Sequence, residues 1–165
     1  MSERRFVVEQ GGIFDANHVL DASVSTVYNG YALTLATDAE LELPSDAGNR
    51  IFGLAYEHQG LVELPTTADL STNLAGKYIN VVRGDFQAQV SRLLFEGTTL
   101  PTAADTIWSK GDGTLTTTQP SATSGTPTAL GYCIGSAQLN NDADIGYSYQ
   151  TLAKCAFHID LGGIF

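Results

Sequence analysis

The chain has few charged residues, and few of those are basic. Only 16% of its 165 residues are charged, against about 25% in a typical soluble protein. Eight Lys and Arg stand against 18 Asp and Glu, which gives a net charge of −10. Such an acidic surface, with no basic stripe in the sequence, would be repelled by phosphate backbones. We therefore expect no nucleic-acid partner.

Long apolar runs are also missing. No stretch approaches the roughly 20 apolar residues that span a bilayer, and the first ten residues contain only three consecutive apolar ones. This is too short for the core of a secretion signal. We expect a protein that is made in the cytoplasm and has no membrane partner.

Cysteine is scarce, with two residues in the whole chain. Cys133 and Cys155 each lie inside an apolar, strand-like segment, where a free thiol commonly behaves as a small buried hydrophobe. A disulfide needs Cα atoms within about 7 Å of each other, which a sequence cannot show. Buried free thiols are the favoured interpretation, and a bridge stays open as the alternative.

The chain does contain a series of short apolar segments separated by Gly, Asp and Asn turns. Residues 81–90 and 106–115 are examples, and residues 31–35 alternate with period two as half-buried strands do. The pattern predicts an all-β single domain, small and barrel-like. It leaves room for at most one short helix over residues 69–75, with Asp69 as its N-cap and Gly76 just past its end.

Two segments differ from this pattern. Residues 1–26 are predicted to be an N-terminal arm that precedes a β-rich domain over residues 27–165, although residues 6–8 could equally be an ordinary first strand. Residues 116–128 are rich in Thr and interrupted by Pro, which predicts an exposed loop that is mobile unless a partner holds it.

Catalytic and metal-binding motifs are missing from the sequence. The three histidines do not lie at ligand spacings from one another or from cysteine, and residues 140–144 lack the Gly and Glu of a calcium-binding loop. A hydrolase would have to combine Asp85 or Asp112 with the distant His58. The carboxylates of Glu40 and Glu42, two residues apart, could mimic the acid/base pair of a glycosidase, but exposed strand faces carry such pairs routinely. We expect no catalytic residue, no metal site, no cofactor and no enzymatic activity.

Several segments together suggest a family. They are Asn-Gly-Tyr-Ala-Leu at 29–33, Ile-Phe-Gly-Leu-Ala at 51–55, Val-Val-Arg-Gly-Asp-Phe at 81–86, the pair 105–109 and 112–116, and Leu-Gly-Tyr-Cys-Ile-Gly at 130–135. In this order they resemble the small capsid decoration, or cement, proteins of tailed bacteriophages. The resemblance covers about residues 27–161 and implies a β-tulip or barrel-like domain. It also implies a structural virion protein on the capsid exterior, where homotrimers without a cofactor bind the major capsid protein and stabilise the expanded shell.

For a decoration protein, the chemistry of the two ends of the chain, which lie outside the segments that carry the resemblance, predicts the capsid or subunit interface there. The N-terminal residues offer cationic groups followed by an apolar strip that could add a strand to a shell subunit's sheet edge, and the apolar tail could pack against a neighbouring copy. Deleting residues 1–10 is expected to weaken shell binding and to leave the fold intact. The predicted interface residues are Arg4, Arg5, Phe6, Val7, Val8, Ile164 and Phe165.

Two other functions stay open. A carbohydrate-binding or receptor-binding β module would present exposed aromatic residues on one face, for which the candidates are Trp108, Tyr132, Tyr147 and Tyr149, although packing in the core is the favoured role of these rings. A tail-assembly subunit of a virion would also be β-rich, acidic and free of cofactors.

Overall fold

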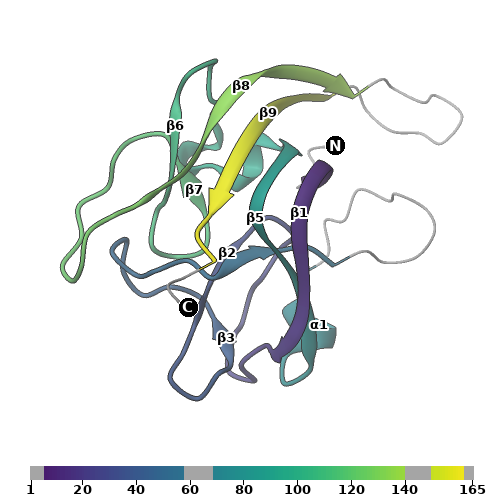
Figure 1. Cartoon of the computed structure of the whole chain (residues 1–165), viewed down its shortest axis with the longest axis vertical. Coiled ribbons are helices and arrows are strands. Elements are labelled where there is room, and N and C mark those ends of the chain that lie inside the picture. The colour runs from purple at the N-terminus through teal and green to yellow at the C-terminus, as the bar shows by residue number, and fades with distance from the viewer. Residues whose placement is uncertain (1–5, 58–68, 140–149, 162–165) are drawn as a thin grey trace, which may run out of the picture.

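The computed structural model describes residues 6–57, 69–139 and 150–161. In these residues the fold is nearly all β, which confirms the predicted class and the single domain (Figure 1). The strands are β1 (Phe6–Val19), β2 (Ala32–Leu35), β3 (Leu41–Glu42), β4 (Gly53–Ala55), β5 (Tyr78–Val90), β6 (Thr106–Ser109), β7 (Leu115–Thr116), β8 (Ala129–Leu139) and β9 (Gln150–Ile159); the helices are α1 (Ser71–Leu74) and the two 3-10 turns Arg92–Leu94 and Glu96–Thr98.

All of these strands belong to one curled antiparallel sheet. Its order is β3-β2-β4-β5-β9-β8-β6-β7, and β1 pairs with β5 outside this path. Val82 of β5 pairs with both Phe14 and Leu54, and Phe86 pairs with both Gly11 and Phe157. Strand β1 therefore runs along one side of β5, whereas β4 and β9 share the other side. The sheet forks along β5 into a branch with β4, β2 and β3 and a branch with β9, β8, β6 and β7.

A bend in β5 marks the fork. The pairing with β4 ends at Val82, and the pairing with β9 begins at Gly84. Gly84 has a φ of 75°, a conformation that glycine adopts with little strain. A Cβ atom here would lie 3.7 Å from the Ile13 side chain, which is an ordinary contact. The backbone conformation, and not crowding, is what requires glycine at this position.

The buried Arg83 side chain ties the fork together. It is only 8% exposed, its Nε donates to the Phe52 carbonyl at 2.7 Å, and its guanidinium carbon lies 3.6 Å from the centroid of the Phe52 ring. Its Nη1 lies 3.6 Å from an oxygen of Asp15, and its Nη2 donates to the Leu161 carbonyl at 3.3 Å. Burial lowers the pKa of the Arg83 guanidinium, and the charge of Asp15 opposes this shift. One cation thus joins β1, the approach to β4 and the end of β9.

The branch with β4, β2 and β3 curls until its two edges meet at Leu20. This residue follows β1 and forms bridges to Leu41 of β3 and to Ala75. Its N–H donates to the Lys77 carbonyl at 2.8 Å. The smaller core inside this branch is mainly aliphatic: Leu20, Val27, Leu33, Leu41, Phe52, Ala55, Leu70, Ile79 and Val81.

The larger core lies against the branch with β9, β8, β6 and β7 and is rich in aromatic rings. Phe86 and Phe157 stack with ring centroids 5.1 Å apart, and each faces a glycine across the sheet, Gly11 and Gly131 respectively. Rings beside glycines fill the space that a missing side chain would leave. Cys133 and Cys155 are both buried in this core as free thiols.

Residues 6–19 of the segment predicted as an arm form β1, which pairs with β5 along its length. Phe6 is buried in the larger core, and Leu20 is buried in the smaller one. This part of the segment thus belongs to the sheet, which agrees with the alternative prediction of an ordinary first strand at residues 6–8. Residues 1–5 lie outside the described residues.

The predicted helix is present but shorter than expected. It spans Ser71–Leu74, and its N-cap is Leu70, so the prediction of Asp69 as N-cap was wrong. The Asp69 carboxylate nevertheless accepts from the Ser71 N–H at 2.9 Å and from the Val27 N–H at 2.8 Å, which holds the turn against the body. Gly76 follows the helix with a φ of 78°. Among the described residues, no helix has the length and apolar character to cross a membrane.

The Thr-rich loop over residues 116–128 is largely exposed, as predicted, and a carboxylate of the same chain holds it. Asp46 accepts hydrogen bonds from the N–H and the hydroxyl of Thr123, both at 2.9 Å, and from the N–H of Ser124 at 3.3 Å. It also accepts from the Gly48 N–H at 2.8 Å. These bonds, led by that from the Thr123 N–H, lower the pKa of Asp46 to about 2.

Candidate functional site

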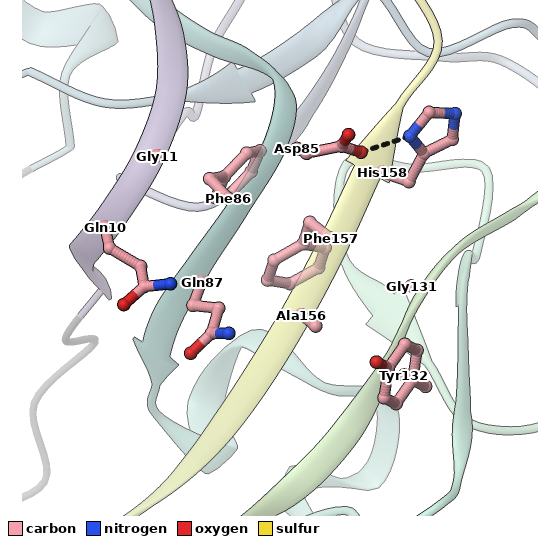
Figure 2. Close-up of a pocket in the computed structure, with 10 residues that line it drawn as sticks. All are labelled: Gln10, Gly11, Asp85, Phe86, Gln87, Gly131, Tyr132, Ala156, Phe157 and His158. Carbon is pink, nitrogen blue, oxygen red and sulfur yellow. Dashed lines mark hydrogen bonds and ion pairs between the residues drawn. The ribbon is translucent and has the colours of Figure 1, made fainter.

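A shallow depression of about 310 Å³ crosses the outer face of β1, β5, β9 and β8 (Figure 2). Side chains alternate between the two faces of a strand. Because Phe86 and Phe157 point into the larger core, their neighbours Asp85, Gln87 and His158 point outward. The depression is lined by Gln10, Gly11, Asp85, Phe86, Gln87, Gly131, Tyr132, Ala156, Phe157 and His158.

One cross-strand row forms the middle of this depression. Gln10 pairs with Gln87, Gln87 with Ala156, and Ala156 with Tyr132. The small Ala156 leaves the Tyr132 ring standing free, and this ring is 53% exposed. Gly131 is required beside it, because a Cβ atom there would lie 2.1 Å from the Ala156 carbonyl oxygen. The row therefore presents two amides and a phenol ring around a floor of small residues.

An ion pair closes one end of the depression. Asp85 and His158 face each other across β5 and β9, and His158 Nδ1 is hydrogen-bonded to Asp85 Oδ1. Both side chains are largely exposed. The hydrogen bond and the charge of Asp85 raise the pKa of His158. From the sequence, a hydrolase would have had to combine Asp85 or Asp112 with His58. The structure instead places Asp85 beside His158, and His58 lies outside the described residues.

The chemistry of the depression suits binding. Among the described residues that line it there is no Ser, Thr or Cys beside the Asp85–His158 pair to serve as a nucleophile. The amides of Gln10 and Gln87 and the Tyr132 hydroxyl are hydrogen-bonding groups, and an exposed aromatic ring offers a flat apolar surface. The arrangement can hold a polar ligand or a polypeptide segment.

The predicted interface residues fall into two groups. Phe6, Val7 and Val8 lie in β1, where they pair with Val90, Gln89 and Ala88 of β5. Phe6 is buried, and the other two are half-buried. Deleting residues 1–10 would thus remove a core side chain and destabilise the fold, contrary to the expectation from the sequence. Arg4, Arg5, Ile164 and Phe165 lie outside the described residues.

Sequence reasoning missed two exposed apolar side chains on β1, Ile13 and Phe14, which we call the edge patch. They are consecutive residues of the strand and so lie on opposite faces of the sheet, on either side of its edge. Their exposed fractions are 52% and 55%. Ile13 lies over Gly84, and the Phe14 ring lies 5.7 Å from that of Tyr56, between centroids. Among the described residues, β1 pairs with β5 alone, so the edge patch lies on an edge strand. A signal was available, because the sequence Gly-Gly-Ile-Phe occurs at 11–14 and again at 162–165.

Comparison with known proteins adds no family. No protein-family model, curated protein or solved structure matches this chain. The resemblance to capsid decoration proteins therefore stays a prediction that rests on the sequence segments alone.

The candidate aromatic residues are divided by the structure. Tyr132 is exposed, whereas Trp108 is half-buried, so the favoured core role does not apply to Tyr132. Tyr147 and Tyr149 lie outside the described residues, as does the run 140–144.

Three carboxylates also gather away from the depression. Ligand oxygens of Asp21, Asp38 and Glu40 lie within 4.8 Å of one another. Partial burial, with the charges of Asp38 and Asp21, raises the pKa of Glu40. The sequence did not indicate this group, because Asp21 is distant along the chain. The charges of Asp38 and Asp21 thus repel that of Glu40. Hydrogen bonds from Ser23 lower the pKa of Asp21.

Proposed function

We propose that this chain is a non-enzymatic structural protein of a virion, which binds the outer surface of a phage capsid as homotrimers and stabilises the expanded shell. The resemblance of residues 27–161 to decoration proteins supports this function. Many weak contacts on one shell would add up through avidity, and a net charge of −10 would keep the free protein soluble.

The edge patch is the observation that carries the proposal. Edge strands present unpaired backbone groups to other chains, and large exposed apolar side chains mark interaction surfaces. Tyr78, at the start of β5, adds a ring that is 66% exposed to the same pair of strands. A shell subunit would bind along β1 by adding a strand to its free edge, where it would cover Ile13 on one face of the sheet and Phe14 on the other.

Co-sedimentation of the purified chain with expanded and unexpanded heads of its own phage tests this function. We expect saturable binding to expanded heads alone. Ile13→Asp should weaken it about tenfold or more, the loss expected when a central apolar contact is removed. Ile134→Asp is the matched control, since Ile134 is an exposed isoleucine on β8, and it should bind like the unchanged chain.

Binding to neither form of head would overturn the proposal. Polymerisation into tubes without a shell would favour a tail-assembly subunit instead. Equal loss of binding in both isoleucine variants, with both still folded by circular dichroism, would remove the edge patch from the account.

The depression around Tyr132 favours one other candidate function, a carbohydrate-binding or receptor-binding module. An exposed aromatic ring between amides and an ion pair is suited to the apolar face and the hydroxyls of a sugar. A glycan array tests this candidate, with Tyr132→Ala as the variant. Binding that is lost in Tyr132→Ala and kept in Ile13→Asp would favour the carbohydrate-binding module over the capsid function.

A further inference from the structure

The two cysteines of the chain face each other across the sheet. Cys133 of β8 and Cys155 of β9 are direct partners in the register of this antiparallel pair. Partners of this kind project their side chains to the same face, here into the larger core, where both residues are fully buried. The two thiols are thus neighbours in space although 21 residues separate them in the chain.

The backbone around Cys133 defines the kind of pair. The Cys133 N–H donates to the Asp105 carbonyl at 2.8 Å, and the Cys133 carbonyl accepts from the Ala104 N–H, also at 2.8 Å. Both backbone groups of Cys133 therefore point away from β9. Cys133 and Cys155 form a non-hydrogen-bonded pair, the position at which opposing Cα atoms are closest, about 4.5 Å apart. A disulfide needs Cα atoms about 4.4–6.8 Å apart.

We propose that Cys133 and Cys155 are a cross-link site, which forms an intramolecular disulfide between β8 and β9 when the chain meets a small-molecule disulfide such as oxidised glutathione. One cysteine thiolate attacks a sulfur of the oxidant, which releases one glutathione thiolate and leaves a mixed disulfide. The second cysteine thiolate attacks the protein sulfur of this mixed disulfide and releases the other glutathione. Two protein thiols are oxidised, one oxidant disulfide is reduced to two thiols, and the two protons pass to the released thiolates.

The same burial controls when the bond forms. Burial, with the neighbouring Cys133, raises the pKa of the Cys155 thiol, and only the thiolate attacks a disulfide. The Cys133 Sγ lies 3.2 Å from the Gly135 carbonyl oxygen and 3.8 Å from the Pro101 carbonyl oxygen. Because a carbonyl oxygen accepts hydrogen bonds and donates none, neither contact favours a thiolate. Oxidation of the folded chain should be slow, and oxidation during folding should be fast.

The experiment refolds the full chain in a glutathione buffer with excess oxidised glutathione and digests it with trypsin without reduction. Lys154 is the only Lys or Arg after Lys110 in the sequence. Cleavage after these two residues therefore places Cys133 and Cys155 in different peptides. We expect one linked species that joins peptides 111–154 and 155–165 and that reduction splits. The melting temperature should rise by roughly 6–12 °C over that of the reduced chain, because the bond closes a loop of this length in the unfolded state.

Cys133→Ala and Cys155→Ala are the controls, and oxidant should leave their melting temperatures unchanged. If either variant fails to fold, the linked peptide of the unchanged chain decides alone. The proposal is overturned if both thiols still react with a thiol reagent after unfolding, if the link joins two chains, or if the linked chain melts below the reduced one. None of these outcomes depends on capsid binding.

Discussion

The two branches of the sheet differ in how they are closed and in which surfaces they leave exposed. The branch with β4, β2 and β3 closes on itself at Leu20 and buries a mainly aliphatic core. The branch with β9, β8, β6 and β7 packs aromatic rings on its inner face and leaves its outer face open, with the depression around Tyr132 on it. β1 serves both branches and keeps one edge unpaired among the described residues. The comparison suggests that both branches stabilise the domain by burying a core, whereas the surfaces left for binding are the unpaired edge of β1 and the open outer face around Tyr132.

The largest expected effect comes from the inner face of the branch with β9, β8, β6 and β7, which we call the open branch. Phe157→Ala should lower the free energy of unfolding by roughly 3–5 kcal/mol, because it removes a stacked ring and leaves a cavity. Tyr132→Ala, on the outer face of the paired strand, should change it by less than about 0.5 kcal/mol. Urea unfolding measures both variants, and similar losses would mean that the two faces do not differ as described.

The substitution Arg83→Met tests how the two branches are joined. The variant leaves the largely buried Asp15 carboxylate and two carbonyls without their donor. The free energy of unfolding should therefore fall by about 3 kcal/mol or more. Trp108, the only tryptophan, lies in the open branch, so its fluorescence reports that branch while far-UV circular dichroism reports both. We expect the two unfolding midpoints to coincide in the unchanged chain and to separate in Arg83→Met. Coincident midpoints in the variant would show that Arg83 does not couple the branches.

A smaller effect is expected where the Thr-rich loop meets the turn at Asp46. The pKa of this carboxyl is lowered from 3.8 to about 2, so its ionised form favours the folded state. The stabilisation is complete above the unfolded value of 3.8 and is lost as pH falls toward 2. Asp46→Asn loses the charge and half of the acceptors, so its melting temperature should be lower at neutral pH. The difference from the unchanged chain should shrink between about pH 4 and pH 2, and a constant difference would contradict this account.

The smallest effect belongs to the exposed pair of Asp85 and His158. The pKa of His158 is raised, so any stabilisation is present below its ordinary value of 6.5 and is lost as pH rises through the raised one. Solvent screening should keep it below about 0.5 kcal/mol. NMR titration of His158 should show the pKa falling toward its ordinary value in Asp85→Asn. An unchanged titration would mean that the pair does not form in solution.

Local patterns in the sequence were enough to predict the fold class. The turn at 110–114 is a local feature of the same kind: Gly111 and Gly113 adopt positive φ, and Asp112 accepts from the Thr114 N–H. Short glycine-bounded apolar segments determine such features without help from distant residues. The period-two alternation in residues 85–90 likewise places Phe86 inside and Gln87 outside.

Features that depend on distant partners could not be predicted. Residues 9–17 are a mixture of polar residues and glycines that does not predict a strand. They nevertheless belong to β1, because they pair with the long strand β5. Arg83 reads as an exposed charge, and only the fold shows that Phe52, Asp15 and Leu161 surround it. The depression draws on four strands, so its residues become neighbours only when the register of all four is known.

Hydrogen exchange along β1 would test the central claim most directly, by comparing the free chain with the chain bound to expanded heads. If a shell subunit binds the free edge, amides within residues 6–19 should gain protection on binding, with the largest change near Ile13 and Phe14. Protection confined to β8 and β9 around Tyr132, with β1 unchanged, would contradict the account and place the binding surface in the depression.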